Sequence, residues 1–383
     1  MRIEPKLLLS FVFCVCLATL NPACERHREK TKTVAPTRDS LSQHPIYSKY
    51  KFNNSENIIN IGIQPLWAPT GLITEAIRRD NVLRSALSRL GLSIRLYPFL
   101  KGDDVNFFLN RGDLDAGIGG DMPALTAAAA FDVTISSLIQ YGYTSIVANH
   151  HMLLIDLRGR SIGYAYGSNA HYGLLNALEY EAITKDDVDL LPMDVTLMPE
   201  SLHKREIFAF SAWEPTPTIA LNKYSDMVVI HRSLSTGYLY FRKSFSDKNP
   251  QGVRQLIAAE IRAIRWMQED RRNLRLASQW ALSGGKGVSG GKLGVTVEQN
   301  VDLAVNDILG VASSANIPKK LLADDGALNK EFRFLKAIGK IPVNIGWERV
   351  RDSFDMQTAR QIVANQNKYF LNRFKYEAGD NDN

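Results

Sequence analysis

The chain of 383 residues has 46 Lys and Arg against 40 Asp and Glu, which gives a formal net charge of +6. With 45% apolar and 22% charged residues, the composition excludes a chain that is disordered, collagen-like or coiled-coil as a whole. The length predicts about two domains or lobes, and so small a net charge predicts no nucleic-acid partner.

The N-terminal segment predicts export. Basic residues precede a mostly apolar run over 7–20, which suits a signal-peptide core and is too short for an ordinary spanning helix. We therefore expect a signal peptide over 1–23. Cys24 follows it and resembles the lipidation site of bacterial lipoproteins, although Asn21 stands where that family usually has Leu. The alternative is ordinary cleavage nearby, with an incidental Cys24.

Residues 24–56 are polar and show no sustained apolar period, so we expect a lipid-anchored flexible tether. From residue 57 onward, segments in which apolar and polar residues alternate are followed by segments in which apolar residues recur at helical spacing. Expected strands lie at 59–63, 92–97, 115–118, 133–135, 145–148, 161–165, 188–191, 207–212 and 227–230. Expected helices lie at 72–90, 103–110, from 122, at 170–180, at 200–204 and beyond 250, before a frayed tail over 371–383. This alternation predicts an α/β fold with mostly parallel sheets and helices on both faces.

The sequence predicts no catalytic residues, no metal and no cofactor. Residues 285–290 have the spacing of a dinucleotide-binding loop, but they follow a helix instead of a strand, which favours a surface loop. His150 and His151 are adjacent and would point to opposite faces of a strand. All three cysteines lie at or before Cys24, so thiol catalysis has no nucleophile.

Four loops at the carboxyl ends of strands form the candidate ligand site, because open α/β sheets bind ligands there. Their candidate ligand-binding residues are Gln64, Trp67 and Thr70; Gly120 and Asp121; Tyr166, Gly167, Ser168, Asn169, Ala170 and His171; and Trp213 and Glu214. Free N–H groups where a helix begins near Ser168 favour an anionic ligand group, unless Ser168 or Asn169 simply caps the helix. Asp121 and Glu214 either accept from a ligand amine or serve a structural role.

Several stretches resemble one family. GDLDAGIGGDMPALTAAA at 112–129, the segment 156–179, AWEP at 212–215 and AIGKIPVNIGW at 337–347 are similar to the periplasmic solute-binding proteins of ABC importers for nitrate, sulfonates and bicarbonate, including the pyrimidine-precursor binders. The resemblance covers about 57–350. It implies a two-lobed periplasmic binding protein fold with a two-segment hinge. Lobe 1 would hold 57–144 and 235–370, and lobe 2 would hold 145–234.

The resemblance implies a function as well as a fold. We expect a monomeric, non-enzymatic receptor at the periplasm or cell surface, anchored to the membrane, that delivers a small polar organic or anionic ligand to an ABC transporter permease. Buried acids favour a zwitterion such as an aminosulfonate, or an aminopyrimidine, over bare nitrate. The alternatives are a receptor that signals to a membrane sensor, or a pyrimidine-synthase-like enzyme, whose cysteine-rich iron motif is missing here.

Overall fold

The computed structural model describes residues 41–53, 55–289, 294–308 and 315–377. The expected signal peptide, Cys24 and the first part of the expected tether lie outside the described residues. No helix within the described ranges is long and apolar enough to cross a membrane.

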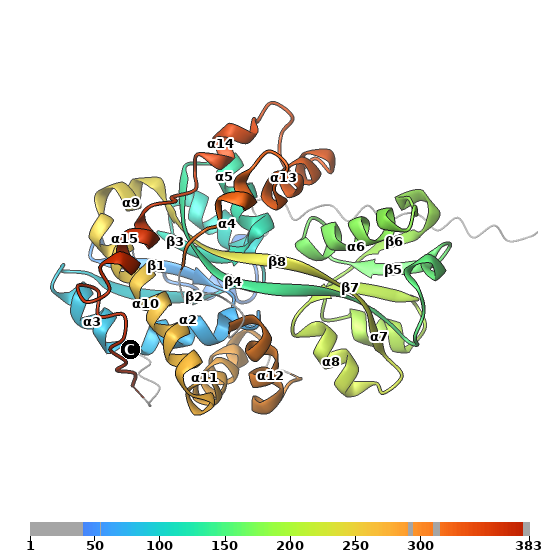
Figure 1. Cartoon of the computed structure of the whole chain (residues 1–383), viewed down its shortest axis with the longest axis horizontal. Helices are drawn as coiled ribbons and strands as arrows, with labels where there is room; N and C mark the ends of the chain where they lie inside the picture. The colour runs from blue at the N-terminus through green and yellow to red at the C-terminus, as the bar shows by residue number, and fades with distance from the viewer. Residues whose placement is uncertain (1–40, 54, 290–293, 309–314, 378–383) are drawn as a thin grey trace, which may run out of the picture. The chain divides into compact units, whose positions relative to one another are not determined.

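One mixed sheet of eight strands runs through the described chain in the order β2-β1-β3-β8-β4-β7-β5-β6 (Figure 1). Parallel pairs join β1 to β2 and β3, and β5 to β6 and β7, whereas β8 and β4 pair antiparallel with each other and with their neighbours. The strands are β1 (Ile58–Ile63), β2 (Ser93–Pro98), β3 (Ala116–Gly120), β4 (Val133–Ala148), β5 (Ser161–Tyr164), β6 (Asp189–Pro192), β7 (Ala209–Trp213) and β8 (Val228–Arg242). The expected α/β class is confirmed.

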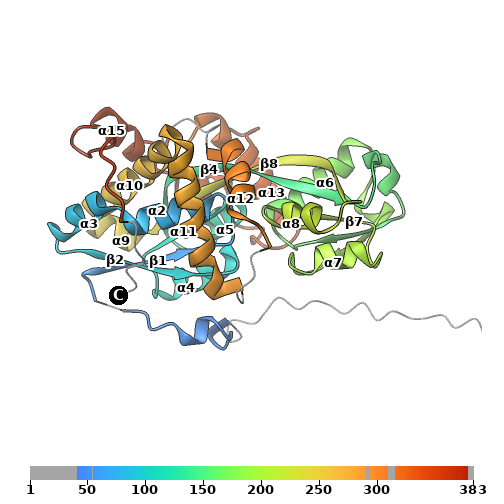
Figure 2. The same cartoon turned by 90° about the horizontal axis from the view of Figure 1, so that it is seen from below.

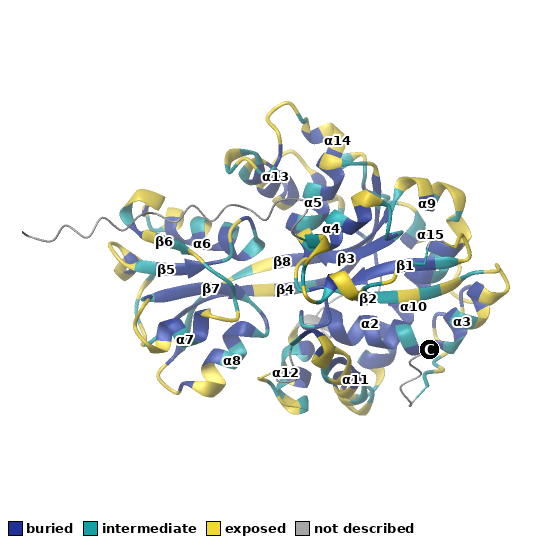
Figure 3. Ribbon diagram, turned by 180° about the vertical axis from the view of Figure 1, so that it is seen from behind, coloured by how far each residue is buried: buried dark blue, intermediate teal, exposed yellow. Residues whose placement is uncertain are grey.

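Two long strands connect the two ends of this sheet. β7 pairs with β4 only from Thr144 onward, and β3 pairs with β8 only as far as Gly237, so between these points β4 and β8 pair only with each other. We call the part with β1–β3 lobe 1 and the part with β5–β7 lobe 2. Figure 3 shows exposed colour on the connection, where Tyr143 is 39% and Leu234 is 57% exposed.

The sequence predicted β4 as two short strands and β8 as one short strand, and both predictions are wrong. Register shifts between Ile135 and Ser137 and between Leu138 and Gln140 interrupt the alternation of apolar and polar residues along β4. A bulge turns every following side chain to the other face, so the period of two that marks a strand is lost. The period of apolar residues therefore does not predict the strands that connect the lobes.

Helices cover both faces of each lobe (Figures 1 and 2). In lobe 1, one apolar cluster packs β1 against α2, α10 and α11, and another packs α4, α5 and α13 together on the opposite face. Lobe 1 has α2 (Thr70–Arg79), α3 (Asn81–Ser88), α4 (Gly102–Arg111), α5 (Asp121–Ala130), α9 (Lys243–Lys248), α10 (Pro250–Glu269), α11 (Arg271–Ser289), α12 (Val297–Ile308), α13 (Ala327–Ala337), α14 (Trp347–Arg351) and α15 (Thr358–Ala364). Lobe 2 has α6 (Asn169–Tyr180), α7 (Met198–His203) and α8 (Thr216–Lys223).

Two further local expectations are corrected. The helix expected over 72–90 is split, because Asp80 ends α2 and caps α3 by accepting the N–H groups of Val82 and Leu83 at 2.8 and 3.0 Å. Residues 285–289 continue α11 instead of forming a surface loop.

The ends of the described chain are packed, so the expected tether and tail do not apply to them. Tyr47 is buried against Phe99 and Phe108, and its hydroxyl donates to Asp104 Oδ2 at 2.7 Å. At the other end, Leu371 is fully buried and the ring of Tyr376 lies 4.3 Å from that of Trp266. Burial of these aromatic and aliphatic side chains fixes both segments to lobe 1. Fraying is thus wrong for 371–377, and flexibility is wrong for 41–53.

Candidate functional site

The four loops that carry the candidate residues follow β1, β3, β5 and β7, and three of them come together around Gly120, beside the connection between the lobes. A methyl group on Gly120 would lie 3.7 Å from the ring of Trp67, 3.7 Å from Thr236 O and 3.8 Å from Asn169 Nδ2. Trp67 belongs to lobe 1, Asn169 to lobe 2 and Thr236 to the connecting strand β8. The structure therefore brings together residues from three separate predicted loops.

Trp67 forms an apolar wall over the sheet. Its side chain is 7% exposed and approaches the backbone of Gly237 so closely that a methyl group there would lie 2.8 Å from the ring. Thr70, in the first turn of α2, is hydrogen-bonded to Gln140 Oε1. The Nε2 group of the same Gln140 is buried without a partner among the described residues. Gln64 is hydrogen-bonded to the sheet, since its Nε2 donates to Ile118 O of β3 at 3.2 Å.

The start of α6 has both capped and free N–H groups. Ser168 Oγ accepts the N–H of His171 at 3.2 Å and donates to Ala165 O, and the N–H of Gly167 donates to His171 Nδ1 at 3.2 Å. The expected alternative of capping by Ser168 is thus confirmed. The N–H groups of Asn169 and Ala170 have no acceptor among the described residues. These two donors and the positive end of the helix dipole favour a negative group.

The charge around this helix start comes from Lys340. Its Nζ lies 3.0 Å from the position that a Cβ atom on Gly167 would occupy. The same Nζ forms an ion pair with Asp103 of α4. Gly167 has a φ of +71°, a left-handed conformation that favours glycine. Burial and, secondarily, the charge of Lys340 lower the pKa of His171 to about 4, so this imidazole is neutral at pH 7.

The other predicted residues of lobe 2 surround this site in structural roles. Tyr166 is half exposed and donates from its hydroxyl to Ile338 O at 2.7 Å. Ala170 is fully buried, and its carbonyl accepts from Ser211 at 2.8 Å. Trp213 ends β7 opposite Thr144 and is partly buried.

The two predicted carboxylates are both occupied within the protein. Asp121 accepts the N–H groups of Met122 and Thr236, each at 2.8 Å, and burial raises its pKa to about 6. Glu214 accepts the N–H of Thr218 at 3.2 Å in the first turn of α8, and burial raises its pKa as well. Of the two expected roles, the structural one is seen for both residues: Asp121 is held through both oxygens and Glu214 through Oε2. Asp121 therefore offers no unpaired oxygen for a ligand amine.

Sequence reasoning missed Gln140, Thr236 and the segment around α13. Gln140 and Thr236 lie in β4 and β8, whose lengths the periodicity hid. Lys340 lies 126 positions after Glu214, the last predicted site residue, in the stretch AIGKIPVNIGW. The chain comes back to lobe 2 there, since the ring of Phe334 in α13 lies 5.1 Å from that of His171. Nothing in the local pattern marks this return.

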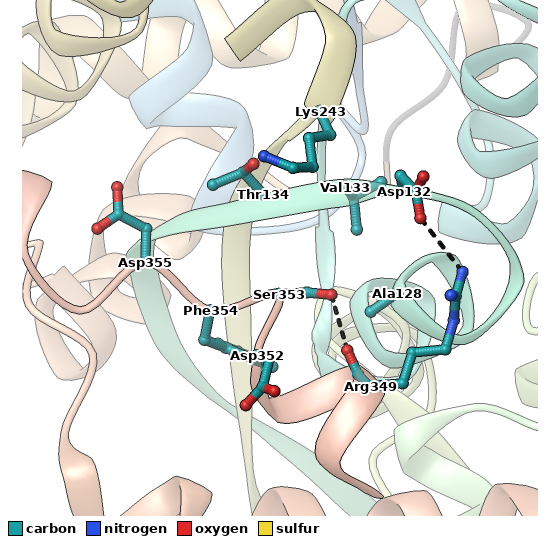
Figure 4. Close-up of a pocket in the computed structure, with 10 residues that line it drawn as sticks. All are labelled: Ala128, Asp132, Val133, Thr134, Lys243, Arg349, Asp352, Ser353, Phe354 and Asp355. Carbon is teal, nitrogen blue, oxygen red and sulfur yellow. Dashed lines mark hydrogen bonds and ion pairs between the residues drawn. The ribbon is translucent and has the colours of Figure 1, made fainter. Parts of the chain in front are cut away.

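A cavity of about 240 Å³ lies elsewhere, between the start of β4 and α14 (Figure 4). It contains no predicted site residue. Its charged groups have partners inside the protein: Arg349 pairs with Asp132 at 3.4 Å, and Lys243 pairs with Asp247 at 3.0 Å. Asp355, on the same wall, accepts two backbone N–H groups at the start of α15. The charged groups named here therefore already have ion-pair or hydrogen-bond partners within the protein.

The described part of the chain has no group of three or more His, Cys, Asp and Glu side chains that could hold a metal ion. No protein-family model matches the sequence, and no curated protein does.

Solved structures do match the fold. The alkanesulfonate-binding protein SsuA from Xanthomonas axonopodis pv. citri, bound to MOPS, is 19% identical with a TM-score of 0.60, and the match covers 78% of this chain and 98% of that one. The periplasmic nitrate-binding protein NrtA from Synechocystis PCC 6803 is 12% identical with a TM-score of 0.60, and the match covers 81% and 89%. The desulfurization enzyme DszB is 14% identical with a TM-score of 0.55, and the match covers 81% of this chain and 99% of that one.

Proposed function

We propose that the protein is an extracytoplasmic receptor that captures a small organic anion, or the anionic end of a zwitterion, between its lobes and delivers it to an ABC importer. The chain has the two-lobed fold of the periplasmic solute-binding proteins for sulfonate and nitrate, and at least one enzyme shares that fold. One observation carries the proposal: the unpaired N–H groups of Asn169 and Ala170 begin a helix beside Lys340 and lie on the lobe that faces Trp67 across Gly120.

The chemistry of the two lobes is complementary for such a ligand. Two N–H donors and a helix start bind a sulfonate or carboxylate group. Trp67 presents flat apolar surface for an organic body. The carboxylates of Asp121 and Glu214 are held by backbone N–H groups, so they repel an anion less than free carboxylates would.

Binding of a model sulfonate tests this function. We expect ethanesulfonate to bind the purified full-length protein in isothermal titration. Asn169→Pro should weaken that binding about tenfold or more, because proline has no backbone N–H yet is tolerated at the first position of a helix. Lys204→Ala, an exposed cation of lobe 2, is the control and should leave the affinity unchanged. The absence of any heat or thermal shift with sulfonates, nitrate, bicarbonate, aminopyrimidines and amino acids would overturn the proposal.

Membrane attachment is a separate part of the proposal. We propose that Cys24 carries a lipid, that the receptor is a monomer, and that lobe 1 (57–144 with 235–370) and lobe 2 (145–234) move about the β4–β8 connection. Fractionation of cells that express either the wild type or Cys24→Ser tests the lipid anchor. Wild-type protein should sediment with membranes and Cys24→Ser should stay in the soluble periplasmic fraction; the same distribution for both would exclude lipidation at Cys24.

A further inference from the structure

Two polar groups on the wall of lobe 1 are buried without partners beside the connection. Glu331 in α13 is 6% exposed, and its Oε2 has no hydrogen-bond partner among the described residues. Tyr238 in β8 is fully buried, and its hydroxyl also lacks a partner there. Buried polar atoms are hydrogen-bonded in the great majority of cases, so two unpaired ones in one place require an explanation.

The two groups belong to one cluster at the seam between the lobes. α13 packs against α5, the helix that begins with Asp121. Tyr238 lies two residues after Thr236, which donates to Asp121. From lobe 2, the ring of Tyr172 lies 5.2 Å from that of Phe334, one turn after Glu331 on α13. Separation of the lobes would uncover this cluster from the side of Tyr172.

The cluster holds two buried carboxyl groups, and no cation acts on Glu331 within the described ranges. Asp121 is the one charged group that acts on Glu331 within the described ranges, and burial and that repulsion raise the pKa of Glu331 well above its ordinary value. The same two carboxyl groups act on Tyr172 and Tyr238, whose pKa values burial raises further. Asp121 is satisfied by its two N–H donors, but Glu331 is not. The group that would complete the cluster is a hydrogen-bond donor with positive charge.

We infer that Glu331 and the Tyr238 hydroxyl form a subsite for an ammonium or amine group on the ligand, separate from the anion-binding start of α6. The inference rests on the proposed function and deepens it, because it selects zwitterionic ligands over simple anions. The two sites adjoin at Phe334 of α13, one turn after Glu331, because its ring contacts those of His171 and Tyr172 in the first turn of α6. A ligand bound at both ends would therefore lie beside α13.

A pair of probes that differ only in the amine tests the inference. Taurine (2-aminoethanesulfonate) and ethanesulfonate are titrated into the wild-type full-length protein and into Glu331→Gln. We expect the wild type to bind taurine about tenfold to a hundredfold tighter than ethanesulfonate, the range of a charge-assisted hydrogen bond. Glu331→Gln should abolish that preference and leave the affinity for ethanesulfonate within about threefold. Tyr238→Phe should reduce the preference in the same direction.

The controls distinguish the outcomes. Glu348→Gln, at an exposed carboxylate of α14, should change neither affinity, and the melting temperature of Glu331→Gln should be no lower than that of the wild type. Equal binding of the two probes by the wild type, or an unchanged preference in Glu331→Gln, would overturn the subsite while the proposed receptor function stands. If neither probe binds, the sulfonate receptor function fails and the subsite fails with it.

Discussion

Asp121 accepts the backbone N–H of Thr236 at 2.8 Å and thereby joins the first turn of α5 to the strand that connects the two lobes. The carboxylate is 1% exposed, and its second oxygen accepts the N–H of Met122. One side chain thus fixes the helix start of lobe 1 relative to β8, at the position where β3 stops pairing with that strand.

Asp121→Asn should destabilise the protein by about 1–3 kcal/mol, because one of the two oxygens becomes an NH2 group that faces a buried N–H donor. Unfolding in urea, followed by circular dichroism, measures the change. Asp226→Asn, at an exposed carboxylate, should stay within about 0.5 kcal/mol of the wild type. Equal stability of the two variants would show that the contact with Thr236 contributes nothing.

Gly120 and Gly237 are paired across β3 and β8, yet alanine should act differently at the two positions. A methyl group at Gly237 would lie 2.8 Å from Trp67 and 2.9 Å from Gln140, so we expect Gly237→Ala to cost about 1–3 kcal/mol in overpacking. A methyl group at Gly120 meets only ordinary contacts at 3.7–3.8 Å, in the space between Trp67 and Asn169. Gly120→Ala should keep the unfolding free energy and weaken ethanesulfonate binding. A stability loss in Gly120→Ala as large as that in Gly237→Ala would contradict this geometry.

Arg262 and Asp80 form a buried ion pair of lobe 1 that should contribute more to the stability of the protein than an ion pair at the surface. Arg262 donates from Nε to Asp80 at 2.8 Å with both side chains at or below 1% exposure, whereas Arg271 and Asp302 pair at the surface, 62% and 69% exposed. Arg262→Met leaves a buried carboxylate without its cationic partner and should cost about 3–5 kcal/mol. Arg271→Met should cost less than about 1 kcal/mol. Chemical denaturation of both variants compares them directly.

Glu260 should make the stability fall as the pH rises. Burial raises its pKa from 4.5 to about 8 in the folded protein, and the hydrogen bond from Ser137 lowers it only in part. Between these two values the unfolded chain releases a proton that the folded chain keeps, so the free energy of unfolding decreases, by about 1.4 kcal/mol for each unit.

Glu260→Gln removes this titration and keeps an oxygen that accepts from Ser137. The variant should match the wild type near pH 4.5 and exceed its stability by a few kcal/mol above about pH 8. Thermal melts at a series of pH values follow the difference, with Glu348→Gln as the exposed control. Parallel pH profiles for Glu260→Gln and the wild type would contradict the assignment.

The sequence predicted the elements whose periodicity is intact, and with them most of the candidate site. β1 and α4 lie within two residues of their expected bounds, and so do the loops at Trp67 and Ser168, because strands that end beside helix starts carry strong local signals. The bulges of β4 erased such a signal. The approach of Lys340 and Glu331 to the other residues is a product of tertiary packing, which no single-sequence period encodes.

The packing of Tyr47 gives the molecule a mechanical asymmetry. Its hydroxyl accepts the N–H of Leu100 and donates to Asp104, and its ring sits among aromatic side chains that include Phe99 and Phe108. A load pulled through the chain that precedes Tyr47 therefore enters lobe 1 between β2 and α4. These contacts are all with lobe 1, so tension on Tyr47 reaches lobe 2 only after it has passed through lobe 1.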